Sequence, residues 1–145
     1  MKKIMLAIVL CLSVSFASAD SAQANTKAIS VVIGALFDSL QKGDAKAAFE
    51  LQTPDTKRLF STPEKFLEAI QGCCNALTNT HQASLADLKL SGLNAAATVL
   101  IIDRSGGRWV AVFVMEQHYG VWQIDACHTK PFENKPVKSK PRKST

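Results

Sequence analysis

Two stretches of the sequence indicate the fold, GDAKAAF at residues 43–49 and YGVWQIDAC at residues 119–127. In the first, Gly43 can end one helix, because glycine readily adopts the left-handed backbone of a helix C-terminus, and Asp44 can cap the next. In the second, a turn containing glycine precedes apolar residues at every other position, the pattern of a half-buried strand. Helices followed by strands predict an α+β domain.

The first half of the chain carries the spacing of amphipathic helices. Upstream of Gly43, apolar residues recur three and four positions apart, which places them on one face of a helix. The stretch STPE at 61–64 is a further start signal, with proline at the first helical position and an acid beside it. We therefore expect helical segments at about 25–43, 45–51, 55–60 and 63–79.

In the second half, from about residue 83, the apolar period changes to two. A weak strand at 83–90 is followed by clearer strands at 96–103, 109–116 and 121–128, and turn sequences rich in glycine separate the last three. Consecutive hairpins make an antiparallel meander. We expect N-terminal helices packed on a curved antiparallel sheet, the architecture of a cystatin-like cone.

One of these strands carries no polar residue on either face. Residues 109–115 read WVAVFVM, whereas an antiparallel strand with one wet face alternates between polar and apolar residues. Helices can cover one face, so we expect a homodimer through the other, open sheet face. The alternative is a sheet that curls enough to bury both faces within one chain.

The two ends of the chain differ in composition from the domain. Lys2 and Lys3, the apolar run 4–16 and the small residues 17–19 form a secretory signal peptide, with cleavage expected before Asp20. The domain then spans 20–129, and residues 130–145 form a disordered basic tail with a repeated Lys-Pro pair. Because the tail holds the excess of basic residues, the charge does not indicate a nucleic-acid partner. We expect an exported protein, periplasmic or secreted.

Three cysteines remain after the signal peptide: Cys73, Cys74 and Cys127. Disulfides persist in the oxidising environment of exported proteins, and an odd number leaves one thiol over. We favour a bridge from the Cys73–Cys74 pair to Cys127, which closes a loop of about 53 residues and stabilises the fold by about 4 kcal/mol. No Cys/His spacing is typical of zinc, so we expect no metal and no cofactor.

The layout resembles the nuclear-transport-factor-2-like, or ketosteroid-isomerase-like, superfamily of α+β cones. More closely, residues 29–127 resemble a bacterial family of small exported proteins of unknown function. The shared elements are the helix junction at Gly43-Asp44, the strand that begins at Trp109 and the Gly-x-Trp-x-Ile motif at 120–124. The two motifs, as joints and core of the cone, place any site inside it, between the first helix and the Trp109 strand. The resemblance implies the fold. It implies no activity, because fold does not fix function.

No constellation of residues predicts a reaction. Cone-fold enzymes use inward-facing acids, a tyrosine or a histidine. We identify no convincing equivalent of these residues in this sequence. We interpret Asp38 as solvated and Asp103 as a turn residue, and Asp125 is predicted to share a face with Gln123 and Cys127. We interpret the three histidines, at 81, 118 and 128, as surface residues.

Trp109 and Trp122 are the candidate ligand-binding residues, because adjacent antiparallel strands could place both on one face as an aromatic floor. The alternative for both is core packing. We expect a non-catalytic module that binds a small apolar ligand or a partner protein. Two alternatives stay open: a cone-fold enzyme of the isomerase, dehydratase or hydrolase type, and an envelope-associated protein whose basic tail binds an anionic surface.

Overall fold

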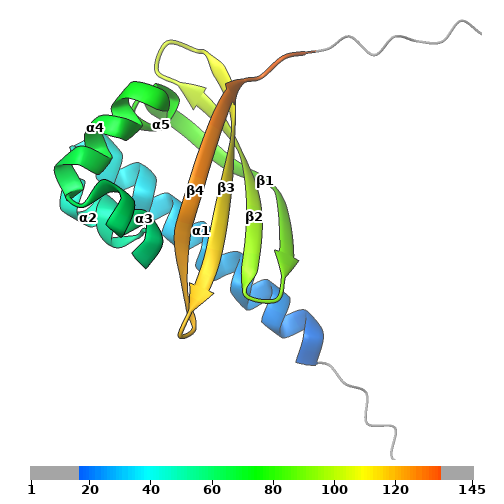
Figure 1. Cartoon of the computed structure of the whole chain (residues 1–145). Helices are drawn as coiled ribbons and strands as arrows, with labels where there is room; N and C mark the ends of the chain where they lie inside the picture. The colour runs from blue at the N-terminus through cyan, green and yellow to red at the C-terminus, as the bar shows by residue number, and fades with distance from the viewer. Residues whose placement is uncertain (1–16, 135–145) are drawn as a thin grey trace, which may run out of the picture.

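The computed structural model describes residues 17–134, in which helices precede a four-stranded sheet. The helices lie on one face of the sheet, and α1 runs across that face (Figure 1). None of the described helices is long and apolar enough to span a membrane. Most of the predicted signal peptide and residues 135–145 of the predicted tail lie outside the described residues. The elements in chain order are α1 (Ala17–Lys42), α2 (Ala45–Glu50), α3 (Pro54–Phe60), α4 (Pro63–Cys73), α5 (Asn75–Thr78), β1 (Thr80–Ser91), β2 (Asn94–Asp103), β3 (Arg108–His118) and β4 (Val121–Pro131).

The first helix begins at Ala17, earlier than the predicted start at about residue 25. Thr26 lies within α1, where its hydroxyl donates to the carbonyl oxygen of Ala22 at 2.9 Å. This bond to the preceding turn lets threonine sit inside a helix. The side chain of Asn25 accepts a hydrogen bond from Trp122 Nε1 at 3.2 Å. Asn25 and Thr26, at the predicted start, therefore lie inside α1, and Asn25 contacts β4.

The junction at Gly43-Asp44 is confirmed. Gly43 has a positive φ of 67°, and Asp44 Oδ1 accepts from the backbone N–H of Ala47 at 3.0 Å. The predicted helix at 63–79, by contrast, is interrupted. Cys74 leaves the helical conformation with φ −135° and ψ 47° and separates α4 from α5, which turns its side chain into the core, where it is buried.

The strands form one antiparallel sheet in the order β1-β2-β3-β4, so the predicted α+β cone architecture is confirmed. β4 extends to Pro131, beyond the predicted domain end at 129. Its register with β3 shifts where Val114 pairs with Ala126 and Met115 with Ile124. Asp125 is thus the extra residue of a β-bulge.

The bulge corrects the predicted faces of β4. Without it, Cys127 and Ile124 would point to opposite sides of the sheet. With it, Cys127 pairs with the buried Phe113 and Ile124 with the buried Met115, so both face the helices. The predicted grouping of Cys127 with Gln123 is wrong for this reason.

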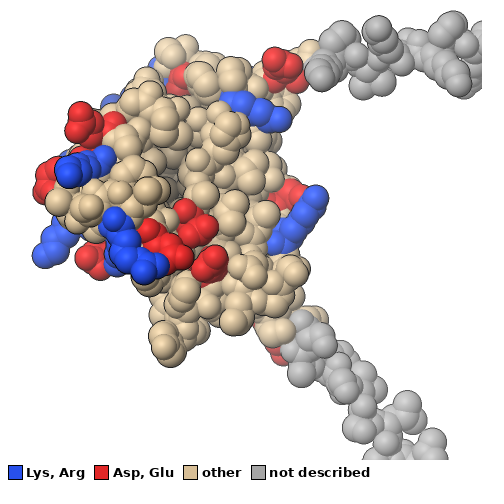
Figure 2. Space-filling model, viewed as in Figure 1, with Lys and Arg blue, Asp and Glu red and all other residues tan. Residues whose placement is uncertain are grey.

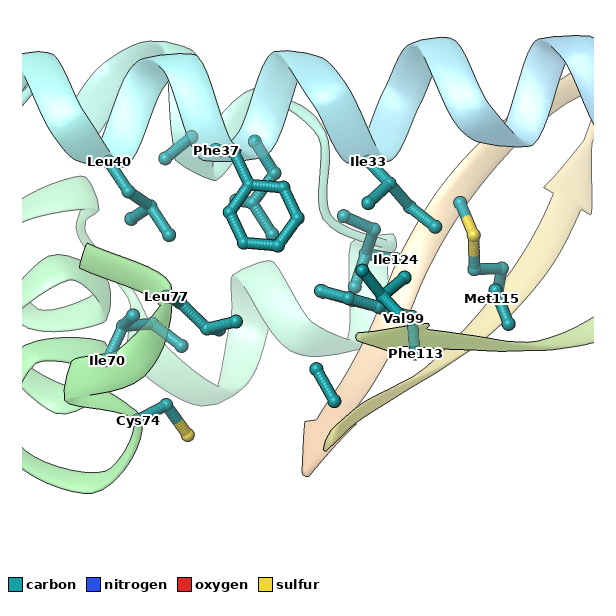
Figure 3. Close-up of a cluster of buried hydrophobic side chains, with 14 of the residues drawn as sticks. Ile33, Phe37, Leu40, Ile70, Cys74, Leu77, Val99, Phe113, Met115 and Ile124 are labelled. Atoms are coloured by element: carbon teal, nitrogen blue, oxygen red, sulfur yellow. The ribbon is translucent and has the colours of Figure 1, made fainter. Parts of the chain in front are cut away.

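The core lies between α1 and the helix-facing side of the sheet. Ile33, Phe37 and Leu40 point from α1 toward side chains of the strands, including Phe113 (Figure 3). The rings of Phe37 and Phe113 meet edge to face, with centroids 6.0 Å apart. Trp122 and Ile124 of the Gly-x-Trp-x-Ile motif are buried here as well, which confirms the packing role expected for that motif.

Candidate ligand-binding cleft

A cleft of about 230 Å³ opens between the short helices and β4. Its lining is mostly apolar, and its mouth includes Leu59, which is 77% exposed. Ile70 and Leu77 point from the helices toward the interior (Figure 3), and Ile124 lines the same cleft from β4. The lining residues are Leu36, Gln52, Thr56, Leu59, Phe60, Phe66, Ala69, Ile70, Cys73, Leu77, Ile124, Asp125, Ala126 and Cys127.

One carboxylate enters this lining, at the β-bulge. Asp125 is half-buried, and its Oδ1 accepts a hydrogen bond from the Thr53 hydroxyl at 2.9 Å. The Thr56 hydroxyl donates to the Asp125 backbone carbonyl at 2.7 Å. Both threonines are buried. The bulge therefore directs Asp125 toward the start of α3, where the two hydroxyls fix its position.

The segment between α2 and α3 is also fixed to β4 through its backbone. The N–H of Thr53 donates to the carbonyl of Ile124 at 2.9 Å, and the N–H of Ile124 donates to the carbonyl of Leu51 at 2.8 Å. Gln52 and Ile124 form a parallel bridge. These backbone bonds attach the helical half to the last strand, so the polar end of the cleft is pre-organised.

Two thiols complete the lining, Cys73 at the end of α4 and Cys127 on β4. All three cysteines of the described residues are free thiols, so the predicted disulfide is not present. Burial, and in second place the neighbouring thiols Cys74 and Cys73, raise the pKa of Cys127 well above its ordinary value. Burial and the Cys73 thiol also raise the pKa of Cys74, to about 11.

This arrangement suits a small apolar molecule that carries one hydrogen-bond donor. Apolar side chains supply most of the contact area, and Asp125 is the carboxylate among the lining residues that a donor could reach. None of the lining residues is a histidine or a lysine. Among the described residues, no group of three or more His, Cys, Asp or Glu side chains could hold a metal ion.

The two tryptophans do not form the predicted aromatic floor. Trp109 pairs with Pro131 and Trp122 pairs with Gln117, so they lie at opposite ends of the β3–β4 pair. Along β3 they are separated by roughly 27 Å at the usual rise per residue. Trp122 is 3% exposed, and Trp109 lines a separate small pocket with Arg108 and Phe132. Neither lines the cleft, and a ligand role for either stays a prediction.

The other predicted surface residues divide into two groups. Asp38, His81 and His128 are exposed, and His118 lies 3.0 Å from Glu116. Asp103 is buried at the turn where it was expected. Its carboxylate accepts hydrogen bonds within the β2–β3 hairpin.

Thr53 and Thr56 were not among the predicted site residues. Their signal was present, because Thr53-Pro54 repeats the threonine–proline start of Thr62-Pro63. Thr53 and Thr62 each cap a helix by accepting from the backbone N–H three residues later. Only Thr53 also reaches β4, and the helix start signal does not indicate that contact.

One protein family matches most of the chain. The family described as "domain of unknown function (DUF4864)" matches residues 22–136. No curated protein sequence matches the chain.

Three solved structures share the fold. One, an NTF-2-like protein of unknown function from Silicibacter pomeroyi, aligns with a TM-score of 0.56 and 15% identity over 77% of this chain and 98% of that one. Another, an NTF2-like protein of unknown function from Shewanella baltica, aligns with a TM-score of 0.51 and 19% identity over 76% of this chain and 97% of that one. A putative dehydratase of the NTF2-like family from Streptomyces avermitilis aligns with a TM-score of 0.50 and 13% identity over 77% of this chain and 99% of that one. At these identities the likeness shows the fold alone.

Proposed function

The chain belongs to the DUF4864 family of unknown function, and we propose that it is an exported, non-catalytic module that binds a small apolar ligand in the cleft. The observation that carries this proposal is the lining itself. Aliphatic and aromatic side chains of α3, α4, α5 and β4 surround the space, and Asp125 is held at one end by Thr53. Concave, mostly apolar sites with a few placed polar groups are the usual form of small-molecule sites.

The size of the cleft limits the ligand. A volume of about 230 Å³ corresponds to roughly eight waters at about 30 Å³ each. A monocyclic or small bicyclic molecule with about that number of heavy atoms would fill it. Phenol and indole are suitable probes, because each joins an apolar ring to a single donor that could bond to Asp125. At the affinity per heavy atom typical of small ligands, we expect a Kd on the order of 0.1–1 mM.

Binding can be measured by titrating phenol or indole into isotope-labelled protein and following amide chemical shifts. We expect the largest shifts at Ile70, Leu77 and Ala126, which line the cleft. Ala69→Phe places a ring in the cleft and should weaken binding at least tenfold. Ala86→Phe is the matched control, since Ala86 is exposed on β1, and its affinity should equal that of the wild type. Shifts confined to other surfaces, or equal affinity in Ala69→Phe, would contradict the proposal.

The enzyme alternative has one observation in its favour. Asp125 is a carboxylate fixed at the edge of an apolar cleft, a position from which it could act as a general base. The same probes separate the two functions. Chemical turnover of a bound molecule that is lost in Asp125→Asn, while binding persists, would favour the enzyme. Binding without any turnover favours the module.

The export part of the proposal is supported by the basic start, apolar run and small residues of 1–19. N-terminal sequencing of the protein recovered from a bacterial host should begin at Asp20, and recovery with Met1 retained would contradict it. In an oxidising compartment, a bridge from the Cys73–Cys74 pair to Cys127 can form. The basic tail, largely residues 135–145, lies outside the described residues, so its binding to an anionic surface stays a prediction.

We also propose that the protein is a homodimer through the open face of the sheet. Val110 and Val112 are half-buried on that face, and Val114 is 42% exposed. In Figure 2, charged side chains gather over the helical layer, whereas the surface along the sheet carries few. An exposed apolar face bordered by polar residues is typical of an interaction surface.

A further inference from the structure

All three cysteines of the described residues gather where the end of α4 meets β4. Cys73 is the last residue of α4, Cys74 is the break that follows, and Cys127 lies on β4. The sulfur atoms of Cys73 and Cys74 are 2.8 Å apart. Cys73 and Cys127 line the same cleft. The three thiols therefore form one group, although Cys127 is far from the other two in sequence.

Two local irregularities of the backbone bring this group together. The bulge at Asp125 turns Cys127 toward the helices, because it shifts the register of β4 by one residue. The non-helical backbone of Cys74 turns its thiol inward, close enough to β4 for the Thr129 side chain to influence its pKa. Thr129 pairs with Ala111, two positions from the pair of Cys127 and Phe113. Cys74 therefore lies near Cys127, whose pKa it also raises.

The three thiols differ in their access to solvent. Cys73 is exposed, Cys74 is buried and Cys127 is half-buried. Burial raises the pKa of both Cys74 and Cys127, which keeps them protonated and slow to attack an external molecule. Cys73 is therefore the thiol that a molecule from solution can reach first.

We propose that Cys73, Cys74 and Cys127 form a thiol–disulfide exchange site whose substrate class is a disulfide, with Cys73 as the entry thiol and Cys74–Cys127 as the pair that retains the bond. The inference goes beyond ligand binding in the cleft and does not depend on it. With the bridge between Cys74 of the helical half and Cys127 of the sheet, Cys73 is the thiol that stays free.

The exchange proceeds in three displacements. The Cys73 thiolate attacks a disulfide RSSR, forms a mixed disulfide with one RS group and releases RS⁻. Cys74 then attacks the Cys73 sulfur and releases the second RS⁻. Cys127 attacks the Cys74 sulfur and releases the Cys73 thiolate. In total, Cys74 and Cys127 lose two electrons and two protons, and RSSR gains them as two molecules of RSH.

The test uses oxidised glutathione as the disulfide and reduced protein carrying Cys11→Ser, so that these three thiols alone report. Samples are quenched with N-ethylmaleimide over time and mapped by peptide mass spectrometry. We expect a Cys74–Cys127 bridge with Cys73 labelled by the maleimide. In Cys73→Ser the same bridge should form at least tenfold more slowly. In Cys127→Ala the reaction should stop at glutathione on Cys73 or at a Cys73–Cys74 bridge.

Two results would overturn the proposal: a Cys127 thiol that remains fully alkylated in the wild type, or a Cys73→Ser rate equal to that of the wild type. Gln71→Ser, an exposed change on the same helix, is the matched control and should keep the wild-type rate. Far-UV circular dichroism and the urea midpoint of each reduced variant verify that it is folded. Phenol binding to the reduced variants is measured separately, so a failure of the exchange site is distinguishable from a failure of the ligand site.

Discussion

At the scale of single residues, Asp103 organises the β2–β3 hairpin. Its Oδ1 accepts from the backbone N–H of Ser105 at 2.9 Å, from the Ser105 hydroxyl at 2.7 Å and from the N–H of Gly107 at 2.7 Å. Its Oδ2 accepts from Trp109 Nε1 at 2.8 Å. A Cβ on Gly107 would lie 2.5 Å from Asp103 Oδ2, so any other residue there would displace the carboxylate from these bonds. The turn thus closes around an ionised carboxylate.

These bonds predict how stability depends on pH. Hydrogen bonds from Ser105 and Trp109 lower the pKa of Asp103 from 3.8 to about 2. A carboxyl whose folded pKa is depressed contributes stability above its unfolded pKa, and that contribution is lost as the pH falls through the folded value. We expect Asp103→Asn to lower the urea midpoint at pH 7, and its difference from the wild type to shrink between about pH 4 and about pH 2.

The control for this prediction is Asp38→Asn, which removes the same charge from an exposed position on α1. It should leave the urea midpoint at pH 7 unchanged. If the urea midpoints of Asp103→Asn and the wild type differ by the same amount from pH 7 to pH 2, the charge of the carboxylate does not stabilise the hairpin.

At the scale of elements, the contact between α3 and β4 depends on Thr53. Its hydroxyl caps α3 by accepting from the N–H of Thr56 and also donates to Asp125, while the whole residue is 1% exposed. Thr62 caps α4 in the same way but is only half-buried. Comparing substitutions at Thr53 and Thr62 therefore distinguishes the contribution of the helix cap from that of the contact with β4.

We expect Thr62→Val to lower the free energy of unfolding by about 1 kcal/mol, the usual contribution of a cap. Thr53→Val should cost about 2–3 kcal/mol, because it also leaves a half-buried carboxylate without its donor. Urea unfolding of the two variants measures both values. Equal losses would mean that the bond to Asp125 contributes nothing to stability.

The same elements show what sequence can predict here. The helix junction at Gly43, the second start at Pro63 and the three hairpin strands follow from local signals, namely a positive φ, a cap and an alternating period. The bulge at Asp125 carries no such signal, because it is defined by pairing with β3 rather than by its own residues. Since one extra residue reverses every side chain after it, the position of Cys127 could not be predicted from the alternating pattern. The cleft was not predicted for the same reason, because the bulge directs Asp125 and Cys127 into its lining.

At the scale of the whole molecule, the outer face of the sheet has no helical cover in the described structure. It is apolar at its centre and charged at its two edges, with Asp87 and Lys89 on β1 and Lys130 on β4. A two-fold axis parallel to the strands would place β1 of one copy over β4 of the other, so that Asp87 of one copy approaches Lys130 of the other. The residues at the centre of this face include Ala96, Thr98, Leu100, Ile102, Val110, Val112, Val114 and Ala126.

Val114→Glu tests this dimer. The side chain is 42% exposed in a single chain, so glutamate is tolerated in the monomer, whereas a dimer would bury two like charges near the centre of its interface. We expect the dimer Kd to rise more than about a hundredfold, since an unpaired buried charge costs about 3 kcal/mol or more. Val31→Glu makes the same change on α1, where Val31 is 64% exposed, and should leave the mass unchanged. Sedimentation velocity measures each mass; a monomeric wild type, or a Val114→Glu variant that remains a dimer at low micromolar concentration, would exclude this face as the interface.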